Sequence, residues 1–142
     1  MDNPDLRLQQ LRAHIADTEQ RYSRSPGSVH LLAVSKTHSS ENIRVLINAG
    51  QQYIGESYIQ EALPKIRQLA DLSPACSVQW HFIGPIQSNK TRDIAENFSW
   101  VHTIDRAKIA QRLNDQRPEN MPVLNVCLQV NISGEPSKSG IT

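Results

Sequence analysis

Short apolar segments alternate with helix-like segments along most of this 142-residue chain. The apolar segments are the expected strands, at residues 30–36, 52–56, 80–84, 100–104 and 123–132. Between them, apolar side chains recur every three to four residues, which is typical of helices packed on a sheet. Short connections in such an alternation favour parallel strands joined by right-handed crossovers. The pattern therefore predicts an α/β fold, either a doubly wound sheet or a (β/α)8 barrel.

Two observations bear on this choice. No GxGxxG motif follows the first expected strand, which argues against a dinucleotide-binding Rossmann domain. Five strands are expected, whereas a closed barrel has eight strands and usually about 250 residues. We therefore expect residues 1–142 to form a single, incomplete barrel domain that belongs to a longer chain or is completed by another chain. A helix capped by Asn3 and running over residues 4–22 is expected to precede it.

The composition narrows the range of partners. Fifteen Lys and Arg residues against fourteen Asp and Glu residues leave a formal charge of +1, which argues against a nucleic-acid-coating surface. No apolar run reaches the roughly 18–20 residues of a membrane span, and the polar N-terminus is not a secretory signal. Cys76 and Cys127 are then expected to be reduced thiols, too few for a zinc site. We expect a cytoplasmic protein that binds no nucleic acid, membrane or metal.

Polar residues follow the ends of several expected strands. In parallel α/β folds, ligand sites lie where strands end and helices begin. Lys36 ends the first strand, Ser57 follows the second, Asn89 and Lys90 follow the third, and Lys138 follows the fifth. Three lysines at one edge would favour an anionic ligand. From spacing alone, solvated loop positions are the simpler interpretation of Lys90 and Lys138.

Lys36 is the most informative of these residues. Strand alternation places it on the same face as Leu32 and Val34, so in a barrel its amine would emerge from a dry interior. Such surroundings favour a neutral amine, which can add to a carbonyl and form a Schiff base. The alternative is a lysine that simply extends from the strand end into solvent, and spacing alone favours that alternative.

The remaining candidates leave more than one interpretation open. Glu56 could orient a lysine or meet solvent. His81, inside the third strand, is more simply a packed, hydrogen-bonded residue than a functional one. Residues 84–90 could hold an anion at a helix N-terminus or form a plain loop capped by Ser88. No Ser/His/Asp order, HExxH motif, Walker loop or CxxC pair is present.

Five segments give the chain a specific resemblance. They are LLAVSKT (31–37), IGESYIQE (54–61), WHFIGPIQSNK (80–90), HTIDR (102–106) and QVNISGEPSKSGI (129–141). In this order they resemble the N-terminal portion of the pyridoxal-phosphate homeostasis protein family, single-domain relatives of the alanine racemase barrel. The resemblance spans nearly the whole chain. It implies a (β/α)8 TIM-barrel fold with an extra N-terminal helix, of which about five of eight strands are present.

The same resemblance implies a function. It points to a cytosolic protein, not an enzyme, that holds pyridoxal 5'-phosphate (PLP) as a Schiff base on Lys36 and takes part in vitamin B6 homeostasis. PLP would then be buffered and handed over to PLP-dependent apoenzymes, and the full-length protein is expected to be a monomer. For Lys36, the resemblance favours the Schiff-base role over the solvent-exposed lysine that spacing alone favoured. It also implies that Lys138 assists PLP exchange and that other residues shape the site, namely Ser57, His81, Asn89 and Lys90.

The sequence departs from the family pattern at several positions. Ser57 stands where the family usually has Asn, and His38 stands where some relatives carry a lysine. The family's phosphate-binding stretch and the arginine near the ring nitrogen would lie beyond Thr142. Because each charge-assisted phosphate contact contributes about 1.5–3 kcal/mol, we expect these 142 residues alone to bind PLP weakly.

Two other functions remain open. The chain could belong to a PLP-dependent racemase-like enzyme acting on small amino acids, which would need a second acid or base. Tyr53 and Tyr58, on either side of the second strand, are the candidates for that group. The chain could also be a structural fragment that folds with a partner and binds no cofactor.

Overall fold

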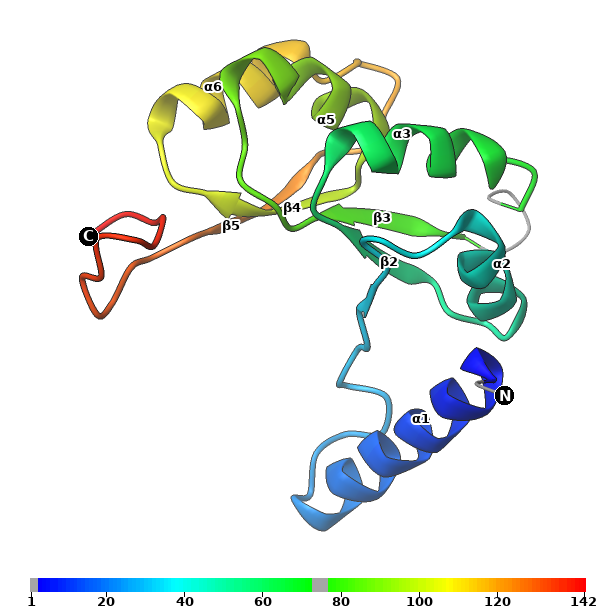
Figure 1. The fold of residues 1–142 in the computed structure, drawn as a ribbon. Coiled ribbons are helices and arrows are strands. Elements are labelled where there is room, and N and C mark those ends of the chain that lie inside the picture. Colours follow the sequence, from blue (N-terminus) through cyan, green and yellow to red (C-terminus); the bar gives the residue numbers. More distant parts are fainter. Residues whose placement is uncertain (1–2, 73–76) are drawn as a thin grey trace.

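The computed structural model describes residues 3–72 and 77–142 as one sheet with helices packed on it (Figure 1). The strands are β1 (Ala33–Val34), β2 (Tyr53–Glu56), β3 (Gln79–Phe82), β4 (Trp100–Ile104) and β5 (Asn125–Leu128). The helices are α1 (Pro4–Arg21), α2 (Ser40–Asn48), α3 (Ile59–Gln68), α5 (Thr91–Asn97) and α6 (Ala107–Gln116), with the 3-10 helix η1 (Ser88–Lys90) before α5. Cys76 lies outside the described residues, and Cys127 is a free, half-buried thiol.

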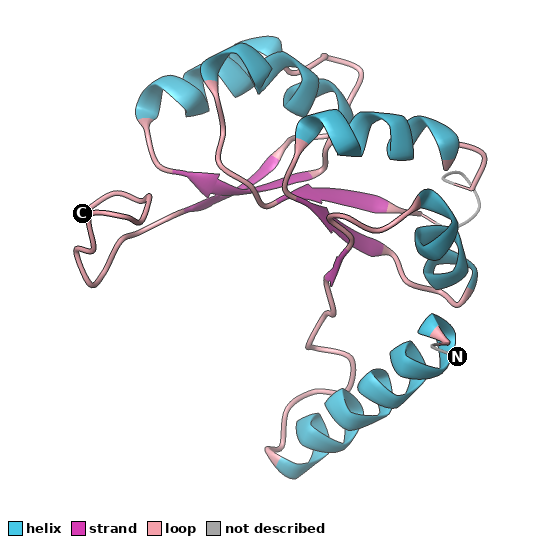
Figure 2. Ribbon diagram, in the orientation of Figure 1, coloured by secondary structure: helices cyan, strands magenta, loops and turns pink. Residues whose placement is uncertain are grey.

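All five strands are parallel and lie side by side in chain order. Helices α2, α3, α5 and α6 lie over one face of this sheet, and the other face is open (Figure 2). A doubly wound sheet carries helices on both faces. The predicted α/β fold is therefore confirmed, and the one-sided cover identifies it as a partial TIM-type barrel.

The hydrophobic core fills the space between the sheet and these helices. Alternate strand residues point into it, because successive side chains of a strand face opposite sides. In register with one another, Ile54 of β2 and Trp80 of β3 are both buried there. The helices and the residue that ends α5 contribute fully buried side chains to this core, namely Ile43, Ile47, Ile94, Phe98, Ile109 and Leu113.

Local chemistry explains where the helices begin. The side chain of Asn3 accepts a hydrogen bond from the N–H of Asp5, and Ser39 accepts one from Asn42, so both helices start at side-chain caps. Ser88, which the sequence left open as a cap after the third strand, makes no side-chain cap, and Asp105 does not cap α6 either. Asp105 instead accepts a hydrogen bond from Nε of Arg106, at 3.2 Å, and Ser88 begins η1.

Pro64 lies inside α3 and does not delay the start of the helix. A proline inside a helix removes one hydrogen bond and leaves the carbonyl four residues earlier without its donor. That carbonyl belongs to Gln60, and both residues are exposed, so water can satisfy it.

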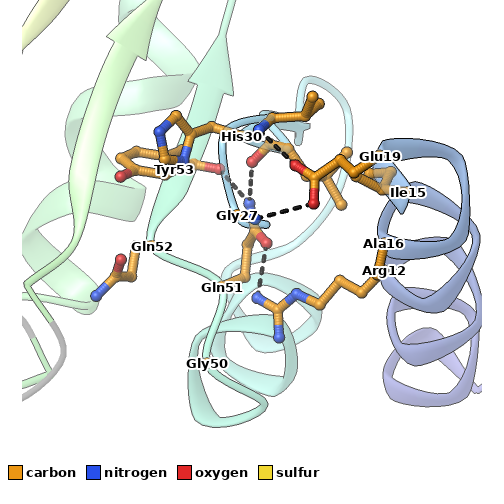
Figure 3. A pocket seen from close by; sticks show the side chains of 12 residues that line it. Arg12, Ile15, Ala16, Glu19, Gly27, His30, Gly50, Gln51, Gln52 and Tyr53 are labelled. Atoms are coloured by element: carbon orange, nitrogen blue, oxygen red, sulfur yellow. Dashed lines mark hydrogen bonds between the residues drawn. The ribbon is translucent and has the colours of Figure 1, made fainter. Parts of the chain in front are cut away.

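Helix α1 stands beside the sheet and is attached by side chains (Figures 1 and 3). Arg12 donates to the carbonyl of Ala49 at 2.9 Å and to Oε1 of Gln51 at 3.0 Å. The buried carboxylate of Glu19 accepts from the backbone N–H groups of Gly27 and Val29. A pocket of about 300 Å³ remains between α1 and the sheet, and these polar groups on its wall are engaged in anchoring the helix.

No helix in the described parts of the chain combines the length and the apolar character that crossing a membrane requires.

Candidate functional site

The carboxyl ends of β1, β2 and β3 lie next to one another at one edge of the sheet. The N–H of Ser35 bonds to the carbonyl of Gly55 at 2.9 Å, and the N–H of Ile83 bonds to the carbonyl of Glu56 at 2.9 Å. Pairing thus continues past β1 and β3. Parallel pairing brings the residues that follow these strands to the same edge, as the sequence predicted.

Lys36 follows β1 at this edge and is exposed. The described residues do not provide the dry surroundings anticipated for it. Val34, on the same side of the strand by alternation, is 49% exposed because it lies on the open face of an edge strand. The amine of Lys36 is accordingly accessible from solvent.

Ser57 and Lys90 line one pocket of about 240 Å³ at the ends of β2 and β3. Both residues are half-buried. Tyr58 lines the same pocket, and Asn89 lies beside it in the chain but is exposed on η1. A hydroxyl and an ammonium group at a strand-end pocket form a donor set that can bind an anionic group.

Gly84 brings the segment after β3 against the end of β2. A Cβ atom placed on Gly84 would lie 2.0 Å from the backbone oxygen of Ser57 and 2.8 Å from its carbonyl carbon. Only glycine allows that approach. The carbonyl of Gly84 in turn accepts a hydrogen bond from Oγ1 of Thr103, at 2.6 Å. Residue 84 therefore fixes the relative positions of the two loops that form the pocket.

Glu56, for which the sequence left two roles open, is fully buried and does not meet solvent. Its Oε1 accepts from Oγ of Ser35 at 2.6 Å and from Nζ of Lys65 at 2.8 Å. Lys65 of α3 is also buried. This ion pair contacts Ser35, the residue before Lys36. Lys65 was not identified from the sequence.

His81 lies on the open face of the sheet, away from the strand-end pocket. It lines a hollow of about 370 Å³ together with Tyr53, Trp100 and His102, among others. Its Nδ1 lies 2.9 Å from Nε2 of His102, and its own Nε2 is buried with no partner among the described residues. Burial, and to a smaller extent the neighbouring His102, lowers the pKa of His81 to about 4. Burial also lowers the pKa of His102.

Lys138 lies on the loop that follows β5, at the opposite edge of the sheet from β1. It is exposed, and its carbonyl accepts a hydrogen bond from the side chain of Asn131 at 3.3 Å. The loop closes on itself through a parallel bridge between Val130 and Ile141. Lys138 therefore does not share the pocket of Ser57 and Lys90. In the described part of the chain, no three His, Cys, Asp or Glu residues are grouped as metal ligands.

A parallel sheet with helices on one face defines the fold class as a partial TIM-type barrel, and Lys36 follows its first strand. The family model described as "Alanine racemase, N-terminal domain" matches residues 6–142, so the chain belongs to that family. Within it, the chain matches the N-terminal portion of proteins named pyridoxal phosphate homeostasis protein. The protein of that name from Vibrio cholerae serotype O1 is 56% identical over 134 residues, and the one from Escherichia coli K12 is 54% identical over 134 residues.

Both alignments cover 94% of this chain and 57% of the relative, so the chain spans little more than half the length of these proteins. Two solved structures are similar. PipY of Synechococcus elongatus with PLP bound is 36% identical with a TM-score of 0.79, covering 99% of this chain and 58% of that one. An unknown protein from Bifidobacterium adolescentis is 30% identical with a TM-score of 0.80, covering 100% and 62%. The resemblance inferred from the five sequence segments is thereby confirmed.

Proposed function

We propose that this chain binds PLP at the carboxyl ends of its strands, that Lys36 holds the ligand as a Schiff base, and that the protein serves PLP homeostasis in the cytoplasm without turning over an amino acid. The observation that carries the proposal is the accessible amine of Lys36 at the edge where β1 and β2 end. The PLP-bound relative supports it, because its structure matches 99% of this chain.

The proposed chemistry is a condensation. The deprotonated amine of Lys36 attacks the aldehyde carbon of PLP, a carbon–nitrogen double bond forms, and the carbonyl oxygen leaves as water. Addition of water reverses the reaction, as a protein that stores and releases PLP requires. Ser57 and Lys90 would bind anionic groups of the ligand in their shared pocket. Transfer of PLP to apoenzymes and assistance from Lys138 are further parts of the proposal.

Reductive trapping tests the site directly. The chain is incubated with increasing PLP, reduced with borohydride, and mapped by mass spectrometry. We expect Lys36 to be half-labelled at a PLP concentration at least about tenfold below that needed for Lys108, an exposed lysine in the first turn of α6. The Schiff base between PLP and a lysine absorbs visible light. Lys36→Arg keeps the positive charge but cannot form the Schiff base, so it should abolish this absorbance, whereas Lys108→Ala should leave it unchanged.

Equal labelling of Lys36 and Lys108 would contradict the proposed site and favour the alternative that the chain is a structural fragment that binds no cofactor. Labelling concentrated on a different lysine would show that PLP binds at that lysine instead of Lys36.

A racemase-like activity is the second candidate function, and Tyr58 is the residue that would support it. Tyr58 is 52% exposed and lines the pocket of Ser57 and Lys90. Tyr53, the other candidate, begins β2 and packs against His30 and His81 on the open face. It lies about 10 Å along the strand from Glu56 at the carboxyl end. Racemisation of alanine that is lost in Tyr58→Phe would favour the enzyme over the storage protein.

A further inference from the structure

Ser35, the residue before Lys36, is buried and held at three points. Its N–H bonds to the carbonyl of Gly55 at 2.9 Å, and its hydroxyl donates to Glu56 at 2.6 Å. Its carbonyl accepts from Nζ of Lys65 at 3.0 Å. The backbone entering Lys36 is therefore tied to both β2 and α3.

Thr37, the residue after Lys36, is held in an unusual conformation. Its φ is +66°, in the left-handed region that β-branched residues rarely adopt. Such a conformation persists only where the surroundings hold it. The N–H of Thr37 donates to Oε2 of Glu61 on α3, at 3.1 Å. That contact comes from a side chain 41% exposed to solvent.

Lys65 lies between Glu56, which contacts Ser35, and Glu61, which contacts Thr37. Its Nζ lies 2.8 Å from Oε1 of Glu56 and 3.6 Å from Oε2 of Glu61. Glu56 is fully buried and Lys65 is nearly so, and buried charges of this kind hold a fixed geometry because neither can be left unpaired at low cost. One helix, α3, thus contacts the residues on both sides of Lys36.

We propose that Glu56, Glu61 and Lys65 are positioning residues for Lys36: they fix the backbone before and after it, and so direct its amine at the sheet edge toward the aldehyde of PLP. The inference rests on the proposed function and adds three residues that act without touching the ligand. Fixing Cα and the direction of Cβ leaves only the side-chain torsions to be ordered when the Schiff base forms. We expect each broken contact to cost a few-fold to tenfold in apparent PLP affinity.

The sharpest test uses Glu61, because its partial exposure means that substitutions there leave the core intact. Glu61→Ala removes the acceptor for the N–H of Thr37, and Glu61→Gln keeps an acceptor oxygen without the charge. Glu96→Ala is the matched control, since Glu96 is 43% exposed and pairs with Arg92 four residues away, at 3.8 Å. PLP titration with borohydride trapping gives the apparent affinity at Lys36, and amide hydrogen exchange reports the Thr37 N–H independently of PLP.

We expect Glu61→Ala to raise the PLP concentration for half-labelling of Lys36 by about 3–10-fold and to speed exchange at Thr37. Glu61→Gln should restore most of the PLP affinity at Lys36 and most of the protection of the Thr37 N–H. Glu96→Ala should change neither the affinity nor the exchange rate. A double variant, Glu56→Gln with Lys65→Met, removes the buried pair without stranding a charge. It should lower affinity at Lys36 by at least as much as Glu61→Ala while the chain still unfolds cooperatively.

Unchanged labelling in Glu61→Ala, or an equal loss in Glu96→Ala, would overturn the positioning role while the proposed function stands. Unchanged exchange at Thr37 would also overturn it, because no contact would then be holding that residue. Failure of the proposed function looks different: the unsubstituted chain itself would show no preference for Lys36.

Discussion

His81 shows how much a single residue on the open face depends on its surroundings. Its ring stacks on Trp100 at a centroid distance of 5.6 Å, and its Nδ1 lies 2.9 Å from His102. Two imidazoles at that distance share one hydrogen bond only if at least one is neutral. The lowered pKa of His81, about 4, agrees with a ring that stays neutral when folded. Its place away from the strand-end pocket favours the structural interpretation.

This neutral ring predicts a pH dependence of stability. An unfolded histidine binds its proton below about pH 6.5, whereas folded His81 binds one only near pH 4. Between these values the unfolded chain carries the extra proton, so the free energy of unfolding decreases as the pH falls from 6.5 toward 4. We expect a loss of about 1–3 kcal/mol over this range, measured by urea unfolding at several pH values.

The matched variants for this measurement are His81→Phe and His14→Gln. The first keeps an aromatic ring beside Trp100 and should flatten the pH dependence, and the second changes an exposed residue of α1 and should not. Identical pH profiles for all three chains would contradict the assignment to His81.

Some residues at the candidate site could be predicted from the local sequence, and others could not. Lys36 and Ser57 were predicted at one edge because Lys36 ends one apolar segment and Ser57 follows the next, and that requires only local sequence. Glu61 and Lys65 were missed because their contacts with residues 35–37 cross between elements. A signal was present: Lys65 falls in the apolar stripe of α3 with Ala62 and Leu69, a position where a charge needs a buried partner.

At the scale of elements, the first and last strands are shorter than their apolar segments. The expected first strand covered residues 30–36, whereas β1 is Ala33–Val34, and the expected fifth covered 123–132, whereas β5 is Asn125–Leu128. Both are edge strands. An edge strand has hydrogen-bonding neighbours on one side only, so fewer of its residues are held in a ladder. β4, which lies between two neighbours, has the predicted bounds, Trp100–Ile104.

Gly84 lets the loops that follow β2 and β3 pack closely against each other. Gly84→Ala would place a Cβ atom 2.0 Å from the backbone oxygen of Ser57, so the segments after β2 and β3 must separate. We expect a loss of about 1–3 kcal/mol in the free energy of unfolding, measured in urea. Gly55→Ala is the control, since its Cβ would meet side-chain atoms rather than backbone, namely Cδ1 of Ile83 at 3.3 Å and Cδ2 and Cγ of Leu32 at 3.4 Å, and should cost less. Equal losses in the two variants would contradict this account.

At the scale of the whole molecule, the sheet is well covered in its middle and uncovered at β5. Val126 and Leu128 are in register with the buried residues Val101 and Ile104, so they lie on the helix side of the sheet. They are nevertheless 50% and 66% exposed. Val126 also lines a hollow of about 420 Å³ beside α6. The chain therefore presents apolar surface on the same side as its own core, next to an unpaired strand edge.

Exposed apolar surface beside a free strand edge promotes association between chains. We expect the 142-residue chain to show a mass that increases with concentration, measured by light scattering after size exclusion. Leu128→Ser should shift that increase to at least about threefold higher concentration, because it removes apolar area from the exposed surface of β5. Leu6→Ser is the control, since Leu6 is similarly exposed, at 56%, but lies on α1. A chain that stays monomeric at all concentrations, or an equal effect of the two substitutions, would show that the helix side of β5 is not the associating surface.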